Sequence, residues 1–172
     1  MGRGKDNLSY DEGFKIEKEK FEVYKPILLS TLQATDIELT TRGLLDKVIS
    51  CDATALIDGL VYGISLRFRS VDYNSFTLNR HYNDPFSEVH KWLQSTHQGN
   101  LKPIYYIQIN ERPDKTLRLI RVNIDAFKWV LEGLIHERRL EGYYAPHLMA
   151  YEFPIDKMKT DWKGIHSSII KP

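Results

Sequence analysis

The stretch that decides the fold is ISCDATALIDGLVYGISLRFR, residues 49–69. It predicts a β-hairpin, because Asp58 and Gly59 both tolerate the positive φ that a tight primed turn requires. The pairs that this turn predicts across the two arms are Ile57 with Leu60, Ala55 with Tyr62, Ala53 with Ile64 and Asp52 with Ser65. A slip by one residue would turn the apolar side chains toward water, so the register is well determined.

The two faces of the predicted hairpin differ in chemistry, because side chains alternate between faces along a strand. The apolar face carries Ile49, Cys51, Ala53, Ala55, Ile57, Leu60, Tyr62, Ile64, Leu66 and Phe68. The other face is polar except for Leu56 and Val61 beside the turn, and it carries Ser50, Asp52, Thr54, Ser65, Arg67 and Arg69. A carboxylate therefore lies beside a hydroxyl and diagonal to a guanidinium, within side-chain reach across the strands.

The polar face has two interpretations. It is either the solvated side of an antiparallel sheet, which is the commoner arrangement, or a cluster that binds a metal ion and a phosphate. The hairpin alone favours the solvated face, and the rest of the chain is needed to decide.

Size and composition limit the class of protein. The 172 residues suffice for one domain with a core, and a hydrophobic content of 42% with a charged content of 27% is ordinary for a globular chain. The formal charge of +1 means that attraction to nucleic acid would have to come from a local patch. The single cysteine, Cys51, excludes an internal disulfide. With no secretory signal and no membrane-spanning run, we expect an intracellular, cytoplasmic protein.

The domain boundaries follow from the polar ends of the chain. We expect a disordered N-terminus over residues 1–12, one domain over residues 13–155 and a C-terminal tail over residues 156–172. Residues 14–33 have helical spacing, with Pro26 marking a kink or the start of a second helix. The following stretch, 34–47, is ambiguous and allows a short helix over 41–47.

After the hairpin, the patterns predict a short third strand at Ser75–Arg80 and then a helix that Asp84 and Pro85 open. PIYYIQI at 103–109 is apolar on both faces, as in a central strand, and a further strand at 116–124 precedes a helix at 125–139. The order is thus helix, three strands, helix, two strands, helix. An antiparallel meander followed by a helical crossover predicts a mixed α/β fold with a central mixed sheet flanked by helices.

This order, with GISLRFR on the second hairpin strand and DPFSEVHKW opening the next helix, resembles the PD-(D/E)XK nuclease superfamily. More narrowly, it is similar to small nuclease-fold proteins of phages and mobile elements. The resemblance covers roughly residues 14–131 and implies a restriction-endonuclease-like αβββαβ core. In that superfamily an Asp begins one strand, and Glu-x-Lys lies on the neighbouring strand. Asp52 takes the Asp position here, and Ser65-Leu66-Arg67 takes the Glu-x-Lys position.

The chain departs from the superfamily at both ends of Glu-x-Lys. Ser65 is a poorer ligand for a hard cation than a carboxylate, and Arg67 is too basic to act as a general base. Arg67 could still clamp a phosphate oxygen. The resemblance implies magnesium, or manganese, held by Asp52 and a second carboxylate. Glu88 is the first candidate for that carboxylate, and Glu17 on the first helix is the second.

The leading hypothesis is metal-dependent hydrolysis of nucleic acid, DNA before RNA, with Asp52, Arg67 and Glu88 as catalytic residues and Asp52 and Glu88 as metal ligands. The side chains expected to contact the nucleic-acid backbone are Arg69, Arg80, Lys91 and Lys47. Two alternatives stay open: a protein of the same fold that binds nucleic acid without cutting it, and a structural or protein-interaction module. No membrane partner is expected, and the resemblance admits a homodimer.

Overall fold

The computed structural model describes residues 10–40, 51–94, 103–161 and 164–171, and within them the strands form two sheets. The central sheet, ordered β1-β2-β3-β5-β6-β9, comprises β1 (Asp36–Leu39), β2 (Ala53–Ile57), β3 (Leu60–Arg69), β5 (Pro103–Glu111), β6 (Leu117–Asn123) and β9 (Ile165–Ile170). The smaller sheet, ordered β4-β8-β7, comprises β4 (Ser75–Asn79), β8 (Ala150–Pro154) and β7 (Tyr144–Ala145). The helices are α1 (Tyr10–Leu32), α3 (Glu88–Gln94), α4 (Ile124–His136), α5 (Ile155–Asp161) and the 3₁₀ helix η3 (Leu140–Tyr143).

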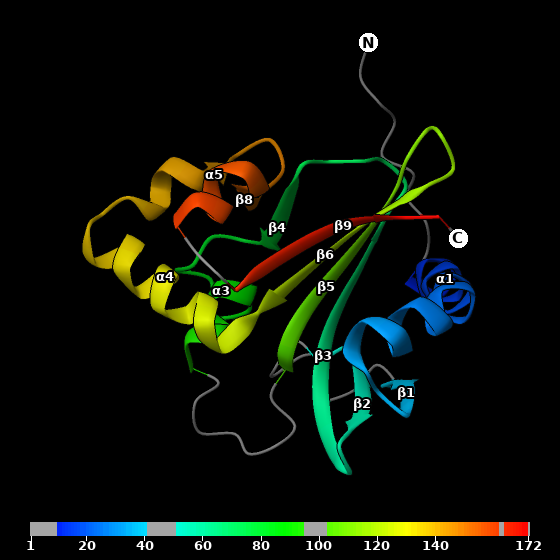
Figure 1. The fold of residues 1–172 in the computed structure, drawn as a ribbon. Helices are drawn as coiled ribbons and strands as arrows, with labels where there is room; N and C mark the ends of the chain where they lie inside the picture. The colour runs from blue at the N-terminus through cyan, green and yellow to red at the C-terminus, as the bar shows by residue number, and fades with distance from the viewer. Residues whose placement is uncertain (1–9, 41–50, 95–102, 162–163, 172) are drawn as a thin grey trace.

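The central sheet is mixed, as expected. Strands β1, β2 and β3 form an antiparallel meander, and β5 then pairs parallel to β3. The connection that makes this parallel pairing possible contains β4 and α3, and β6 and β9 extend the sheet in antiparallel fashion. The predicted mixed α/β class, with a central sheet flanked by helices, is confirmed (Figure 1).

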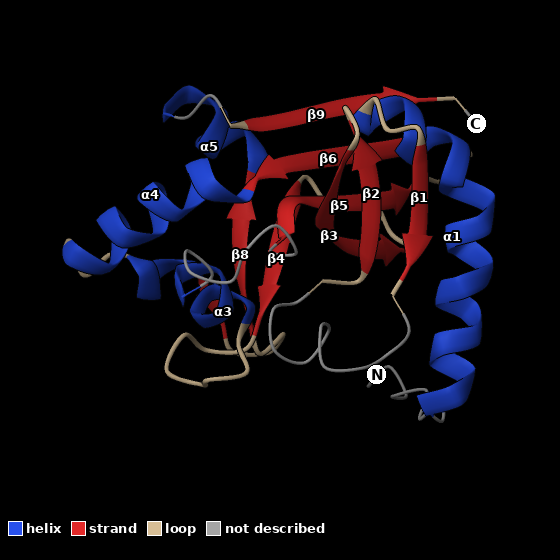
Figure 2. Cartoon of the chain, turned by 90° about the horizontal axis from the view of Figure 1, so that it is seen from below, coloured by secondary structure: helices blue, strands red, loops and turns tan. Residues whose placement is uncertain are grey.

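Two apolar layers hold the helices on opposite faces of the central sheet. Helix α1 covers one face, while α3, α4, α5 and the smaller sheet lie on the other (Figures 1 and 2). The α1 layer joins Phe21 and Leu28 to hairpin residues such as Ala55 and Ile64. The opposite layer is larger and rich in aromatic rings; its largest buried side chains include Trp92, Tyr106, Tyr151, Phe76, Phe127 and Phe153. None of the helices in the described ranges is long and apolar enough to cross a membrane.

The predicted hairpin is confirmed in its turn and its register. Asp58 and Gly59 have φ values of 49° and 78°, the left-handed conformation that the tight turn needs. The observed partners of β2 on β3 are Ile57 with Leu60, Leu56 with Val61, Ala55 with Tyr62, Thr54 with Gly63 and Ala53 with Ile64. The alternation of side chains therefore sends the apolar set toward α1.

A strand forms where the third strand of the meander was predicted, but its predicted position in the central sheet is wrong. The segment expected at Ser75–Arg80 forms β4, which belongs to the smaller sheet and pairs with β8. The meander is completed instead by β1, from the stretch that was ambiguous in sequence. Its four residues, DIEL, bury only Ile37, so they carry too short an alternation to predict a strand. The helix predicted over 41–47 lies outside the described residues.

The predicted tail over 156–172 is also wrong. Helix α5 begins at Ile155, and β9 adds a strand to the central sheet by pairing with β6. IHSSII has no clear alternation of its own, and the unpaired edge of β6 supplies its partner. At the other end, α1 begins at Tyr10, inside the stretch expected to be disordered, and continues through Pro26 as one helix.

Helix α3 starts later than predicted. Asp84 accepts a hydrogen bond from the Phe86 N–H at 2.8 Å and so shapes a turn before the helix. Ser87 is the residue that caps α3, because its hydroxyl oxygen accepts from the His90 N–H at 3.0 Å. This cap places Glu88 in the first turn, at the point where α3 approaches β3 and β4.

Candidate functional site

The candidate site lies where the start of β2, the middle of β3, the end of β4 and the start of α3 meet. Asp52 directly precedes β2, and its N–H donates to the Ile64 carbonyl at 2.9 Å, which continues the hairpin ladder. The Asp52 Oδ2 atom accepts from the Leu66 N–H at 2.7 Å and from the Ser65 hydroxyl at 3.2 Å. The predicted contact between Asp52 and Ser65 is therefore confirmed.

Arg67 reaches from β3 to two other elements. Its Nη2 donates to Glu88 Oε1 on α3 at 2.7 Å, and its Nη1 donates to Asn79 Oδ1 at the end of β4 at 2.6 Å. The second Glu88 oxygen, Oε2, accepts from the backbone N–H of Asn79. The side chains of Arg67 and Glu88 are only 15% and 11% exposed, so this ion pair is nearly buried.

The charges around Arg67 keep it ionised. Burial by itself would lower the pKa of the guanidinium, but the negative charges of Glu88 and Asp52 help to raise that pKa above its ordinary range. Arg69, two residues along the same strand, has the opposite shift. Burial and then the positive charge of Arg67 lower the pKa of Arg69.

A polar ladder on β5 continues this face of the sheet. The side chains of Tyr106, Gln108 and Asn110 alternate with the isoleucines of PIYYIQI and donate to three backbone carbonyls of the segment that contains β4. The three bonds are Tyr106 Oη to Thr77 O at 3.1 Å, Gln108 Nε2 to Ser75 O at 3.0 Å and Asn110 Nδ2 to Tyr73 O at 2.8 Å. The prediction that this strand is apolar on both faces is therefore wrong, although the strand is central.

The ladder decides between the two interpretations of the hairpin's polar face. β4 lies over this face, and Arg69 adds a further bond to it, from Nη2 to Thr77 Oγ1 at 2.8 Å. Ser65, Gln108 and Asn110 are almost completely buried. The solvated outer face that the hairpin alone favoured is wrong for the β3 side of this face, because Ser65 is buried and Arg67 and Arg69 bond to β4.

The structure brings together three of the residues predicted for the site: Asp52, Arg67 and Glu88. Glu17 lies on α1, which packs against the apolar face of the hairpin, and so belongs to the opposite layer. Arg80 directly follows Asn79, with a side chain that is 58% exposed and 3.1 Å from Asp84. Lys91 lies on α3, three residues after Glu88, and Lys47 lies outside the described residues.

Three residues that complete the site, Asn79, Thr77 and Tyr106, were missed in the sequence. Asn79 and Thr77 lie on β4, and they can contact Arg67 and Arg69 only because β4 belongs to the smaller sheet and not to the predicted meander. The alternation of Tyr106, Gln108 and Asn110 along one strand was a signal that could have indicated a polar face.

In this arrangement Glu88 has little capacity left to ligate a magnesium ion. Magnesium requires oxygen ligands in near-octahedral geometry and usually keeps several waters. Both oxygens of Glu88 already accept hydrogen bonds, and one of their donors is a guanidinium whose positive charge opposes a second cation. Metal ligation by Asp52 and Glu88 stays a prediction.

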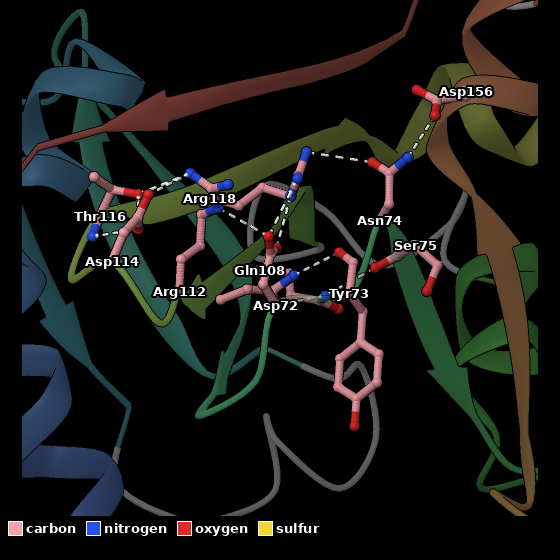
Figure 3. A network of polar contacts seen from close by, with 11 residues as sticks. Asp72, Tyr73, Asn74, Ser75, Gln108, Arg112, Asp114, Thr116, Arg118 and Asp156 are labelled. Atoms are coloured by element: carbon pink, nitrogen blue, oxygen red, sulfur yellow. Dashed lines mark hydrogen bonds and ion pairs between the residues drawn. The ribbon is translucent and has the colours of Figure 1, made fainter.

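A second polar network, at the other end of β4, fastens the β3–β4 loop to the β5–β6 hairpin. Figure 3 shows Asp72 held by two arginines. The Asp72 carboxylate accepts from Arg112 Nε at 3.0 Å and from Arg118 Nε at 2.7 Å. Hydrogen bonds from Arg118, followed by those from Arg112, lower the pKa of Asp72. These charge-assisted hydrogen bonds join the β3–β4 loop to both ends of the β5–β6 turn.

The lowered pKa of Asp72 predicts a pH effect on stability. Because the folded-state pKa lies below the unfolded one, the stabilisation is complete above the unfolded pKa and is lost as the pH falls through the folded pKa. We expect Asp72→Asn to lower the free energy of unfolding at neutral pH and to flatten its decline as the pH falls below about 5. Urea unfolding at a series of pH values measures both effects. Parallel curves for the wild type and the variant would contradict the prediction, and Arg118→Gln should flatten the same region.

In comparisons with known proteins, no family model and no curated protein matches the sequence.

Proposed function

We propose that this protein binds nucleic acid on a nuclease-like scaffold and does not cleave it. Support for the scaffold comes from the order of elements: a helix, three antiparallel strands, a crossover helix and a parallel strand. This is the αβββαβ order that the resemblance to PD-(D/E)XK nucleases implies, with β4 inserted before the crossover helix. Asp52 directly precedes β2, and Ser65 and Arg67 lie on the neighbouring strand β3, which is consistent with the positions that the resemblance implies.

The observation that carries the proposal is the bonding of Arg67. This side chain stands where the superfamily has its lysine, and both of its terminal nitrogens are engaged, one with Glu88 and one with Asn79. A guanidinium held in this way does not deprotonate to activate water, because its pKa is raised rather than lowered. Glu88, in turn, is engaged through both oxygens. The charged groups of the site therefore stabilise one another.

Binding is assigned to the cationic side chains at the rim of this site. Arg80 is exposed next to Asn79, and its pair with Asp84 is a surface ion pair that a phosphate could replace at little cost. Lys91 is half-buried on α3, three residues after Glu88. Phosphate contacts of this kind give affinity without sequence preference and fall off steeply with salt.

The test is fluorescence anisotropy with short single- and double-stranded DNA and RNA, in EDTA and over a series of salt concentrations. We expect salt-dependent binding by the wild type. Arg80→Ala should weaken it about tenfold and reduce the slope of log affinity against log salt by about 1, as for the loss of one phosphate contact. Lys115→Ala is the matched control, because Lys115 is also an exposed cation with positive φ, 62° against 65° for Arg80, and lies at the far end of β5.

Two outcomes would overturn the proposal. Absence of binding at low salt to every probe would leave the structural or interaction module. Magnesium-dependent cleavage that disappears in Asp52→Ala would instead select the nuclease. That second candidate is favoured by one observation, the presence of Asp52 and Glu88 around the same guanidinium.

A further inference from the structure

The guanidinium of Arg67 lies within the negative field of two carboxylates that come from different elements. Glu88 contacts it directly at 2.7 Å. Asp52 approaches from the start of β2, where its Oδ2 is held by the Leu66 N–H and the Ser65 hydroxyl, one and two residues before Arg67. Glu88 therefore pairs directly with Arg67, while Asp52 is held beside Ser65 on the same face of β3, and its negative charge helps to raise the pKa of Arg67.

The negative charges around Arg67 resemble those of a metal centre, but the positive group between them is a guanidinium and not a metal ion. Two carboxylates around one position are the usual protein contribution to a magnesium site. Here the positive charge at that position is covalently attached to the chain, and the directional hydrogen bonds of a guanidinium suit carboxylate and amide oxygens. Asn79 supplies the amide oxygen at 2.6 Å.

We infer that Arg67 takes the place of a divalent cation between Asp52 and Glu88, so that the native site is metal-free and loss of the guanidinium creates a metal site. The inference rests on the proposed function only for the nuclease-like scaffold, which makes Asp52, Arg67 and Glu88 one site. It does not require that nucleic acid binds at this site. It explains how the charges of Asp52 and Glu88 are balanced without the metal that the nuclease resemblance implies.

The test is a titration of the full chain with Mn²⁺, followed by electron paramagnetic resonance, because the signal of hydrated Mn²⁺ is lost when the ion binds. The wild type should bind Mn²⁺ weakly. Arg67→Met removes the charge but keeps an unbranched apolar side chain, and it should bind Mn²⁺ at least roughly tenfold more tightly, because the opposing positive charge is gone. Combining Arg67→Met with Asp52→Asn or Glu88→Gln should abolish this gain.

Arg112→Met is the matched control, because Arg112 also pairs with two carboxylates, those of Asp72 and Asp114. It should gain no Mn²⁺ binding, since Arg118 still holds Asp72.

Circular dichroism checks folding, and Arg67→Ala serves as a second variant. Tight Mn²⁺ binding by the wild type that Asp52→Asn abolishes would overturn the inference, as would folded Arg67 variants with no gain. If neither Arg67 variant folds, the wild-type titration alone tests whether the native site is metal-free. Nucleic-acid binding is a separate measurement, so the two proposals fail independently.

Discussion

Replacing Arg67 by methionine is expected to lower the free energy of unfolding by about 3–5 kcal/mol, the largest effect of a single polar substitution in this protein. The reason is the partner that remains. Glu88 is 11% exposed, so its carboxylate would stay buried without the guanidinium that neutralises it. Urea unfolding followed by circular dichroism measures the change.

A second substitution separates the cost of an orphaned charge from the value of the pair. In Arg67→Met combined with Glu88→Leu, no buried charge is left, and much of the lost stability should return. Arg139→Met provides the surface control, since its pair with Glu137 is 2.8 Å long but the Arg139 side chain is 61% exposed. It should cost no more than about 1 kcal/mol. A comparable loss in both single variants would argue against a special role of burial at Arg67.

Gln108→Leu is expected to cost about 3 kcal/mol, because it breaks the centre of the ladder that joins β5 to β4. The Gln108 amide donates to the Ser75 carbonyl at 3.0 Å and to Asn110 Oδ1 at 2.9 Å. Its oxygen lies 2.7 Å from the Tyr106 hydroxyl and shares that single hydroxyl hydrogen with the Thr77 carbonyl. Leucine fills a similar volume but leaves these buried groups without their partner. Each such group costs about 1–3 kcal/mol, less whatever relaxation recovers.

Hydrogen exchange gives this second prediction a local readout. The ladder fastens the smaller sheet to the central one, so amides of β4 and β8 should exchange faster in Gln108→Leu, while those of β6 change less. Gln94→Leu, at the exposed end of α3, is the control and should alter stability by no more than about 0.5 kcal/mol. Uniform acceleration over both sheets would show that β4 and β8 do not open as a separate unit.

These two substitutions test two different connections between the central sheet and the elements that pack on it. Arg67 and Glu88 join β3 to α3 through charge, and Gln108 joins β5 to β4 through neutral hydrogen bonds. Together they place polar side chains of β3 and β5 between the two sheets, where an apolar layer is the commoner arrangement. Arg67, Arg69 and Gln108 are in this way part of the interface between the two sheets.

The sequence by itself determined the local geometry of the hairpin. Asp58 and Gly59 set the turn, and the alternation after them set which side chains share a face, so the contact of Asp52 with Ser65 could be predicted. These features depend on residues close in the chain and on a period of two, which a short stretch fully specifies. The mixed α/β class followed from the order of such elements.

Only the tertiary structure decided what covers the polar face and which strands complete the sheet. The DIEL of β1 and the IHSSII of β9 are strands because the edges of β2 and β6 offer them backbone partners. Strand β4 pairs with β8 and does not join the meander, and side chains of β5 bind its carbonyls. A pattern of alternation shows which side chains share a face, but the surface that buries that face comes from residues far along the chain, and their approach depends on the packing of the whole domain.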